Sequence, residues 1–195
     1  MAIIFELFIE CESPEAGDAM RAYFAKPSTT LRGGRRINWQ IGRGEPPIYL
    51  TLWSEQLGRF GIDSFQRAVD MSECGIDLAN QLLNAPDFIL ARIGLEVDGY
   101  TRLDFLADFR EEGVAWVPEG MIISTEFWEE LGNPPGLSDF RPGYLWKKYE
   151  GESARPVFMD AELYKMWKKL PGGWRPNNET HPISENRTNT SSKNE

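Results

Sequence analysis

The stretch from Asp63 to Val97 constrains the fold most strongly, because a helical pattern runs directly into a strand pattern. Apolar residues recur every three or four positions in its first part, with polar residues on the opposite side. Asp63 is a suitable N-cap, and Pro86 prevents the helix from continuing. From Ile89 to Val97, apolar and other residues alternate. The sequence therefore predicts a long amphipathic helix that leads into a strand with one buried face.

The segments before this stretch complete a recognisable order of elements. Residues 3–9 alternate as a strand does, and Ser13-Pro14-Glu15 has the residue types that begin a helix. Leu31–Ile41 and Ile48–Trp53 have strand patterns on either side of a Gly/Pro turn, which predicts a hairpin. The order strand, helix, strand, strand, helix, strand predicts an α+β fold with a ferredoxin-like βαββαβ core, in which an antiparallel sheet carries both helices on one face.

We expect three regions: the core at residues 1–98, an irregular α+β extension at 99–174 that packs on the core, and a disordered polar tail at 175–195. The tail is rich in Asn, Thr, Ser and charged residues. Within the extension, the patterns predict strands at Val114–Val117, Met121–Ser124 and Tyr144–Tyr149, a helical turn capped by Thr125, a loop at Asn133–Gly143, and a last helix capped by Asp160 that carries Leu163, Met166, Trp167 and Leu170.

The charge balance narrows the class of partner. With 21 Lys and Arg against 30 Asp and Glu, the net charge is −9. This acidity argues against a nucleic-acid partner, whose backbone requires clustered cations, and it suits a basic protein. It also fits a protein whose charge only maintains solubility. We expect no membrane association and a cytoplasmic location, because the chain has no long apolar run, no basic N-terminal region, and two cysteines without a CxxC motif.

The scarcity of histidine limits the chemistry available. His181 is the only histidine, and it lies in the predicted tail. No Ser-His-Asp, Cys-His or zinc-binding set can therefore form in the folded body. We expect no metal and no cofactor, and we name no catalytic residue. Catalysis by carboxylates alone stays open, because Asp and Glu are plentiful.

Three groups of residues are candidates for binding. The first is an acidic series, in which like charges on one helical face would meet a basic partner or simply face solvent. The second is the loop before Tyr144, where an aromatic residue next to an arginine is typical of a binding anchor or of a packed surface loop. These two groups form the predicted partner-binding site: Asp104, Asp108, Glu111, Glu112, Glu126, Glu129, Glu130, Phe140 and Arg141.

The third group is the face of the predicted sheet away from the helices. Aromatic and polar side chains mix there, which suits either a ligand platform or a face buried beneath residues 100–174. The residues that would line the ligand site are Glu6, Tyr49, Trp53 and Arg92.

Two hypotheses follow. The first is a non-enzymatic acidic protein-binding module, in its most specific form an immunity-type inhibitor that occludes a basic toxin. The alternative is a small-molecule-binding or carboxylate-dependent enzymatic domain that uses the mixed sheet face. A deep pocket beside Trp53 and Arg92 would favour the alternative.

Overall fold

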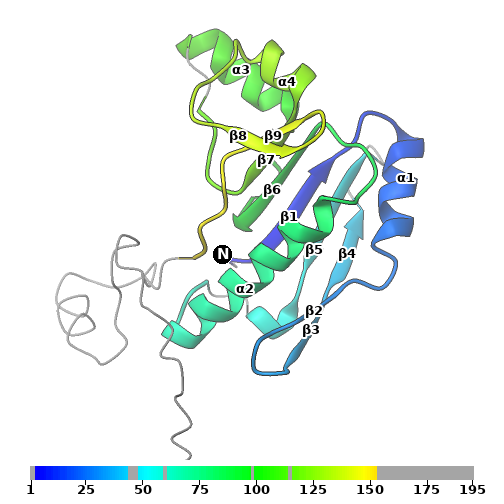
Figure 1. Cartoon of the computed structure of the whole chain (residues 1–195), viewed down its shortest axis with the longest axis vertical. Helices are drawn as coiled ribbons and strands as arrows, with labels where there is room; N and C mark the ends of the chain where they lie inside the picture. The colour runs from blue at the N-terminus through cyan, green and yellow to red at the C-terminus, as the bar shows by residue number, and fades with distance from the viewer. Residues whose placement is uncertain (1–2, 44–47, 59–60, 98, 114–115, 153–195) are drawn as a thin grey trace, which may run out of the picture.

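The computed structural model describes residues 3–43, 48–58, 61–97, 99–113 and 116–152. In this part of the chain, an antiparallel sheet of seven strands combines with four α-helices, so the protein has a mixed α+β fold (Figure 1). The helices are α1 (Pro14–Tyr23), α2 (Phe65–Leu82), α3 (Arg102–Glu112) and α4 (Thr125–Glu130). A short 3-10 helix spans Glu55–Leu57.

The sheet has the strand order β4-β5-β1-β6-β7-β9-β8, and every neighbouring pair is antiparallel. Its strands are β1 (Phe5–Glu10), β4 (Gln40–Arg43), β5 (Tyr49–Trp53), β6 (Leu90–Leu95), β7 (Met121–Ser124), β8 (Ser138–Arg141) and β9 (Tyr144–Trp146). The antiparallel α+β class is as predicted, but the sheet has seven strands, whereas the predicted ferredoxin-like core has four. The specific ferredoxin-like topology is therefore not confirmed.

The interior strand β1 is buried on both sides, and this determines where the two cores lie. Phe5, Leu7 and Ile9 point to one face, where they pack with the fully buried side chains of α2, such as Met71 and Leu78. Met20 of α1 belongs to the same cluster, so α1 and α2 cover the same face. The period of 3.6 residues that was visible in the sequence is what aligns these side chains on α2.

The opposite face of the sheet is also covered. Phe8 of β1 and Leu90 of β6 pack with Phe105 of α3 and Phe127 of α4. Figure 1 shows α3 and α4 grouped at one end of the sheet, away from α1. This second core fills much of the face on which the sequence placed a mixed aromatic and polar surface. The division of the chain into domains stays a prediction.

One predicted strand is wrong in its extent. Leu31–Ile41 is divided into β3 (Arg36–Asn38), which pairs with β2 (Ser28–Thr30) in a separate hairpin, and β4, which joins the main sheet. The chain changes partner at Trp39, whose side chain is buried and donates to Thr29 Oγ1 at 3.0 Å. The hairpin turns at Gly34, which has a φ of +80°, a conformation that glycine adopts without strain.

Smaller predictions also require correction. Ser64 rather than Asp63 caps α2, because its hydroxyl accepts from the Arg67 amide, while Asp63 forms an ion pair with the Arg67 side chain. Ser124 replaces Thr125 as the cap of α4. The predicted 133–143 loop contains β8, and the strand predicted from Tyr144 ends at Trp146.

Some predictions reach beyond the described residues. Of the strand predicted at Val114–Val117, only Trp116 and Val117 are described, and neither is in a strand. The helix predicted from Asp160, the tail and His181 lie outside the described residues.

Candidate functional site

The predicted acidic series is divided between structural and exposed carboxylates. Asp104 belongs to the start of α3, where its Oδ2 accepts from both the backbone amide and the hydroxyl of Thr101 at 2.7 Å. These hydrogen bonds lower the pKa of Asp104. Glu130 forms an ion pair with Arg102, which joins α4 to α3. The remaining members of the series are exposed: Asp108, Glu111, Glu112, Glu126 and Glu129.

Phe140 and Arg141 are engaged within the protein. The ring of Phe140 lies 5.1 Å from that of Trp146. The guanidinium of Arg141 donates to backbone carbonyls at the end of α2 and to Asp87, and it lies 4.1 Å from the ring centre of Tyr144. Only 11% of the Arg141 side chain is exposed. Neither residue is therefore presented as a free surface anchor.

The residues of the alternative ligand site lie on the face covered by the second core. Glu6 is buried and accepts from the backbone amide of Val97 at 3.0 Å. Arg92 donates to the Val97 carbonyl, and its guanidinium lies 5.7 Å from the ring of Phe105 in α3. Tyr49 contacts Phe8, with 5.7 Å between ring centroids, and Trp53 is half-buried. The structure thus occupies much of this face with the protein's own side chains, and its use by a ligand stays a prediction.

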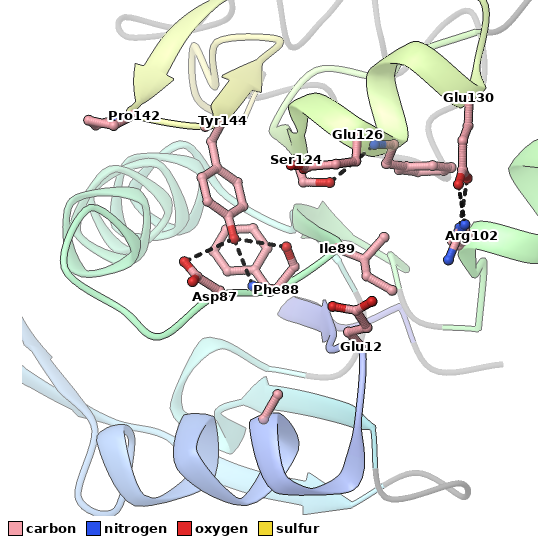
Figure 2. Close-up of a pocket in the computed structure, with 13 residues that line it drawn as sticks. Glu12, Asp87, Phe88, Ile89, Arg102, Ser124, Glu126, Glu130, Pro142 and Tyr144 are labelled. Carbon is pink, nitrogen blue, oxygen red and sulfur yellow. Dashed lines mark hydrogen bonds and ion pairs between the residues drawn. The ribbon is translucent and has the colours of Figure 1, made fainter.

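A cavity of about 420 Å³ opens between α1 and α4. Its walls come from the start of α1, the segment before β6, the first residues of α3, α4, and the turn that joins β8 to β9 (Figure 2). Four carboxylates line it, namely Glu12, Asp87, Glu126 and Glu130, and we call this site the acidic cleft. Figure 2 shows Glu12 on the α1 side and the two α4 carboxylates across from it.

The charges of the acidic cleft are only partly compensated. Arg102 pairs with Glu130, and Arg141 pairs with Asp87 at 3.2 Å. Four carboxylates against two guanidinium groups leave two negative charges. Glu12 and Glu126 carry these two charges, because neither forms an ion pair within the described part of the chain. Both side chains belong to exposed residues, so they remain accessible to a cation.

The apolar part of the acidic cleft is rigidly held. Phe88, Ile89 and Phe127 supply its apolar wall, and hydrogen bonds of the hydroxyl group hold Tyr144 beside them. The Tyr144 hydroxyl accepts from the Phe88 amide at 2.9 Å and lies 3.0 Å from the Phe88 carbonyl and 3.3 Å from Asp87 Oδ1. Burial raises the pKa of Tyr144, so this phenol stays protonated at neutral pH. The cleft therefore combines a fixed apolar wall with accessible negative charge.

Glu10 lies beneath the acidic cleft as a buried carboxylate. Its Oε2 accepts from the Arg102 amide at 2.7 Å, at the start of α3. Burial raises the pKa of Glu10 above its ordinary value of 4.5, against the lowering effects of the Arg102 hydrogen bond and charge. A folded-state pKa above the unfolded value means that Glu10 contributes stability below pH 4.5 that is lost as the pH rises through the folded-state pKa.

Glu10→Gln is expected to raise the free energy of unfolding at pH 7, because the amide keeps an acceptor for Arg102 without the buried charge. The gain should shrink as the pH falls towards 4.5, since Glu10 is then increasingly protonated in the folded protein. Urea unfolding of both proteins at pH 4.5, 5.5 and 7 measures the difference. Glu12→Gln, which removes an exposed carboxylate two residues away, is the control and should show little change. A gain for Glu10→Gln that is independent of pH would contradict this assignment.

Of the acids that line the cleft, sequence reasoning identified Glu126 and Glu130 but missed Glu12 and Asp87. Each of these two is a single acid next to a strand end, without a periodic pattern that distinguishes it from other surface acids. Antiparallel pairing of β1 with β6 brings Glu10 opposite Leu90. Glu12, which follows β1, and Asp87, which precedes β6, therefore lie at the same end of these two strands. No local sequence signal reports that juxtaposition.

No family model, curated protein or solved structure matches this chain. Among the described residues, no cluster of His, Cys, Asp and Glu has an arrangement that could hold a metal ion. None of the helices in the described ranges has the length and apolar character that crossing a bilayer requires.

Proposed function

We propose that this protein is a non-enzymatic binding module that recognises a basic segment of another protein in the acidic cleft. A Lys or Arg side chain of the partner would extend into the cavity between α1 and α4. Its methylene groups would lie against Phe88 and Phe127, and its charged end would meet Glu12 and Glu126. The exposed acids of α3 and α4 would contact further cations around it.

One observation carries this proposal: Glu12 and Glu126 face a cavity with apolar walls and form no ion pair within the described residues. Two accessible like charges beside one cavity raise the local negative potential, which favours a cationic group there. A volume of about 420 Å³ falls within the range of roughly 300–1,000 Å³ that ligand pockets occupy. The net charge of −9 adds long-range attraction for a basic partner.

The specific form of this proposal is an immunity-type inhibitor that occludes a basic toxin. A highly acidic protein can block a basic enzyme by covering the positive surface that binds its substrate. Such an inhibitor should form a stoichiometric complex whose association slows steeply as salt is added. Affinity purification from native lysate at low salt, followed by elution in a salt gradient, would supply the partner for that measurement.

Neutralising the two free carboxylates should weaken binding of a basic probe. We expect Glu12→Gln/Glu126→Gln to raise the Kd for a fluorescent hexa-arginine peptide about tenfold at low ionic strength, which is about 1.4 kcal/mol. Fluorescence anisotropy at several salt concentrations gives the Kd and its salt dependence.

The matched control is Glu96→Gln/Glu150→Gln, which removes the same charge beyond the opposite end of β6. It should change the Kd less than threefold or so, because screening limits the effect of distant charges. Equal weakening by both double variants would show that only the net charge matters, and that result would contradict a specific role for the acidic cleft.

We also propose a finer description of the fold. The part of the sheet with the order β4-β5-β1-β6, together with α1 and α2, would be the ferredoxin-like unit, and β7, β9 and β8 would extend it at the β6 edge. The antiparallel pairing of β1 with both β5 and β6 supports this proposal, as does the placement of both helices in one core cluster.

A further inference from the structure

Helix α2 carries an apolar stripe on the side away from the core. Phe65, Ile76 and Leu83, at the helix and its C-cap, are 50%, 47% and 41% exposed. Their spacing of eleven and seven residues places them on one side of the helix, because both intervals are close to whole numbers of turns. The stripe extends over about 27 Å, at 1.5 Å per residue.

Other described segments cover the flanks of this stripe and leave Phe65, Ile76 and Leu83 exposed. On one flank, the β2–β3 hairpin contacts α2 through Thr29, which donates to Asp77 at 2.7 Å, and through the ion pair of Arg35 with Asp70. On the other flank, Tyr149 lies against Gly75 so closely that a Cβ there would be 2.2 Å from its ring. Between these flanks, the described chain meets the stripe only at Ser72, through Gly151 and Glu152.

The described chain ends on this stripe. The Glu152 amide donates to the hydroxyl of Ser72 at 2.9 Å, and a Cβ on Gly151 would be 2.8 Å from that hydroxyl. Ser72 lies between Phe65 and Ile76 on α2, on the same side of the helix. Residues 153–195 therefore continue from a point near the middle of the stripe.

The sequence that follows has the pattern needed to cover an apolar stripe. Leu163, Met166, Trp167 and Leu170 are spaced i, i+3, i+4, i+7, with Asp160 as a suitable N-cap and Pro171 after the last of them. Asp160 is eight positions beyond Glu152, and an extended chain of that length reaches about 26 Å. Half of the stripe is only about 14 Å long, so this segment can reach either end of it.

We propose that residues 160–170 of this chain form an amphipathic helix that docks on the α2 stripe in the same molecule. The apolar positions from Leu163 to Leu170 span about 10 Å. Leu163, Met166, Trp167 and Leu170 would therefore contact Ile76 and Leu83, which are also seven residues apart. This inference does not depend on the acidic cleft. The cleft lies at the start of β6, whereas Glu152 lies near Gly94, close to the other end of that strand.

A spin label on the segment tests the proposal in the full-length protein. Lys165→Cys places a nitroxide away from the apolar positions of the segment. Cys11 and Cys74 should remain unlabelled in the folded protein, since both are buried and burial raises their pKa to about 11 and about 12. Paramagnetic broadening of amide signals then reports which surface the segment contacts.

We expect the label to broaden signals along the outer side of α2 and to leave α3 unaffected. Adding Ile76→Asp should abolish this broadening, because a carboxylate on the stripe cannot be buried without a partner. Leu103→Asp is the matched control: Leu103 is 70% exposed on α3, so the substitution adds the same charge without touching the stripe. Leu163→Asp should have the same effect as Ile76→Asp, and the two together should cause no further loss.

Three results would overturn the proposal. One is broadening confined to another surface, and another is no broadening anywhere. The third is broadening of α2 only at high concentration together with a dimer mass by light scattering, which would assign the stripe to a second copy of the chain.

Discussion

Arg141→Met is expected to lower the free energy of unfolding by about 3 kcal/mol, because several hydrogen bonds from a charged donor are lost at once. The Arg141 guanidinium donates to the carbonyls of Leu82, Ala85 and Pro86, the last at 3.3 Å. Leu82 is the last residue of α2, and the other two carbonyls follow it, so none of the three accepts a regular i→i+4 helical hydrogen bond. The guanidinium also lies against the ring of Tyr144, so its loss removes packing as well.

Two further variants separate the contributions of Arg141. Arg141→Lys should recover little stability, because an ammonium group cannot reproduce the planar fork that reaches several carbonyls. Asp87→Asn should cost less than about 0.5 kcal/mol, since Asp87 is 93% exposed and surface ion pairs contribute little. Urea unfolding followed by tryptophan fluorescence measures all three. A loss in Asp87→Asn as large as that in Arg141→Met would show that the ion pair, rather than the carbonyl contacts, stabilises this region.

Gly120→Ala is the second substitution with a large expected effect, about 3 kcal/mol of destabilisation. Gly120 has a φ of +78°, which costs a residue with a side chain roughly 1–2 kcal/mol. A Cβ there would also lie 2.4 Å from the backbone oxygen of Ile93. Backbone cannot move aside as a side chain can, so the connection into β7 would have to shift at a further cost of about 1–3 kcal/mol.

Gly113→Ala isolates the conformational part of this effect. Gly113 ends α3 with a φ of +70°, but a Cβ there meets no atom within 4 Å. It should therefore cost only about 1 kcal/mol. Chemical denaturation of both variants gives the difference, which is the steric contribution of the Ile93 contact. Equal losses in the two variants would contradict that contribution.

The elements that could be predicted from the sequence are those in which apolar residues recur at the spacing of a helix or a strand. The 3.6-residue pattern of α2 and the alternation in β1 correctly identified an antiparallel α+β protein. The hairpin of β2 and β3 was missed, although Gly33-Gly34 marks its turn. The alternation of Ile37, Trp39 and Ile41 concealed a change of pairing partner at Trp39. No local pattern reveals which strand a residue will pair with.

The candidate site was less accessible to sequence reasoning than the fold. The sequence does not distinguish Asp104 and Glu130 from the other acids. In the structure, Asp104 caps the start of α3 and Glu130 forms an ion pair with Arg102. Arginine is a residue type typical of surface binding anchors, which is why Arg141 was predicted to contact a partner. In the structure, its guanidinium instead donates to the backbone just beyond α2. The two carboxylates that remain available, Glu12 and Glu126, lie far apart in the sequence and converge only through the register of the sheet.

The most direct test of the acidic cleft as a binding site is a titration of isotope-labelled protein with unlabelled hexa-arginine peptide, followed by amide chemical shifts. We predict that the largest shifts lie around the cleft, at residues 12–16, 87–89, 124–130 and 142–144. Shifts distributed evenly over all acidic surfaces, or centred on α2, would contradict the proposed function.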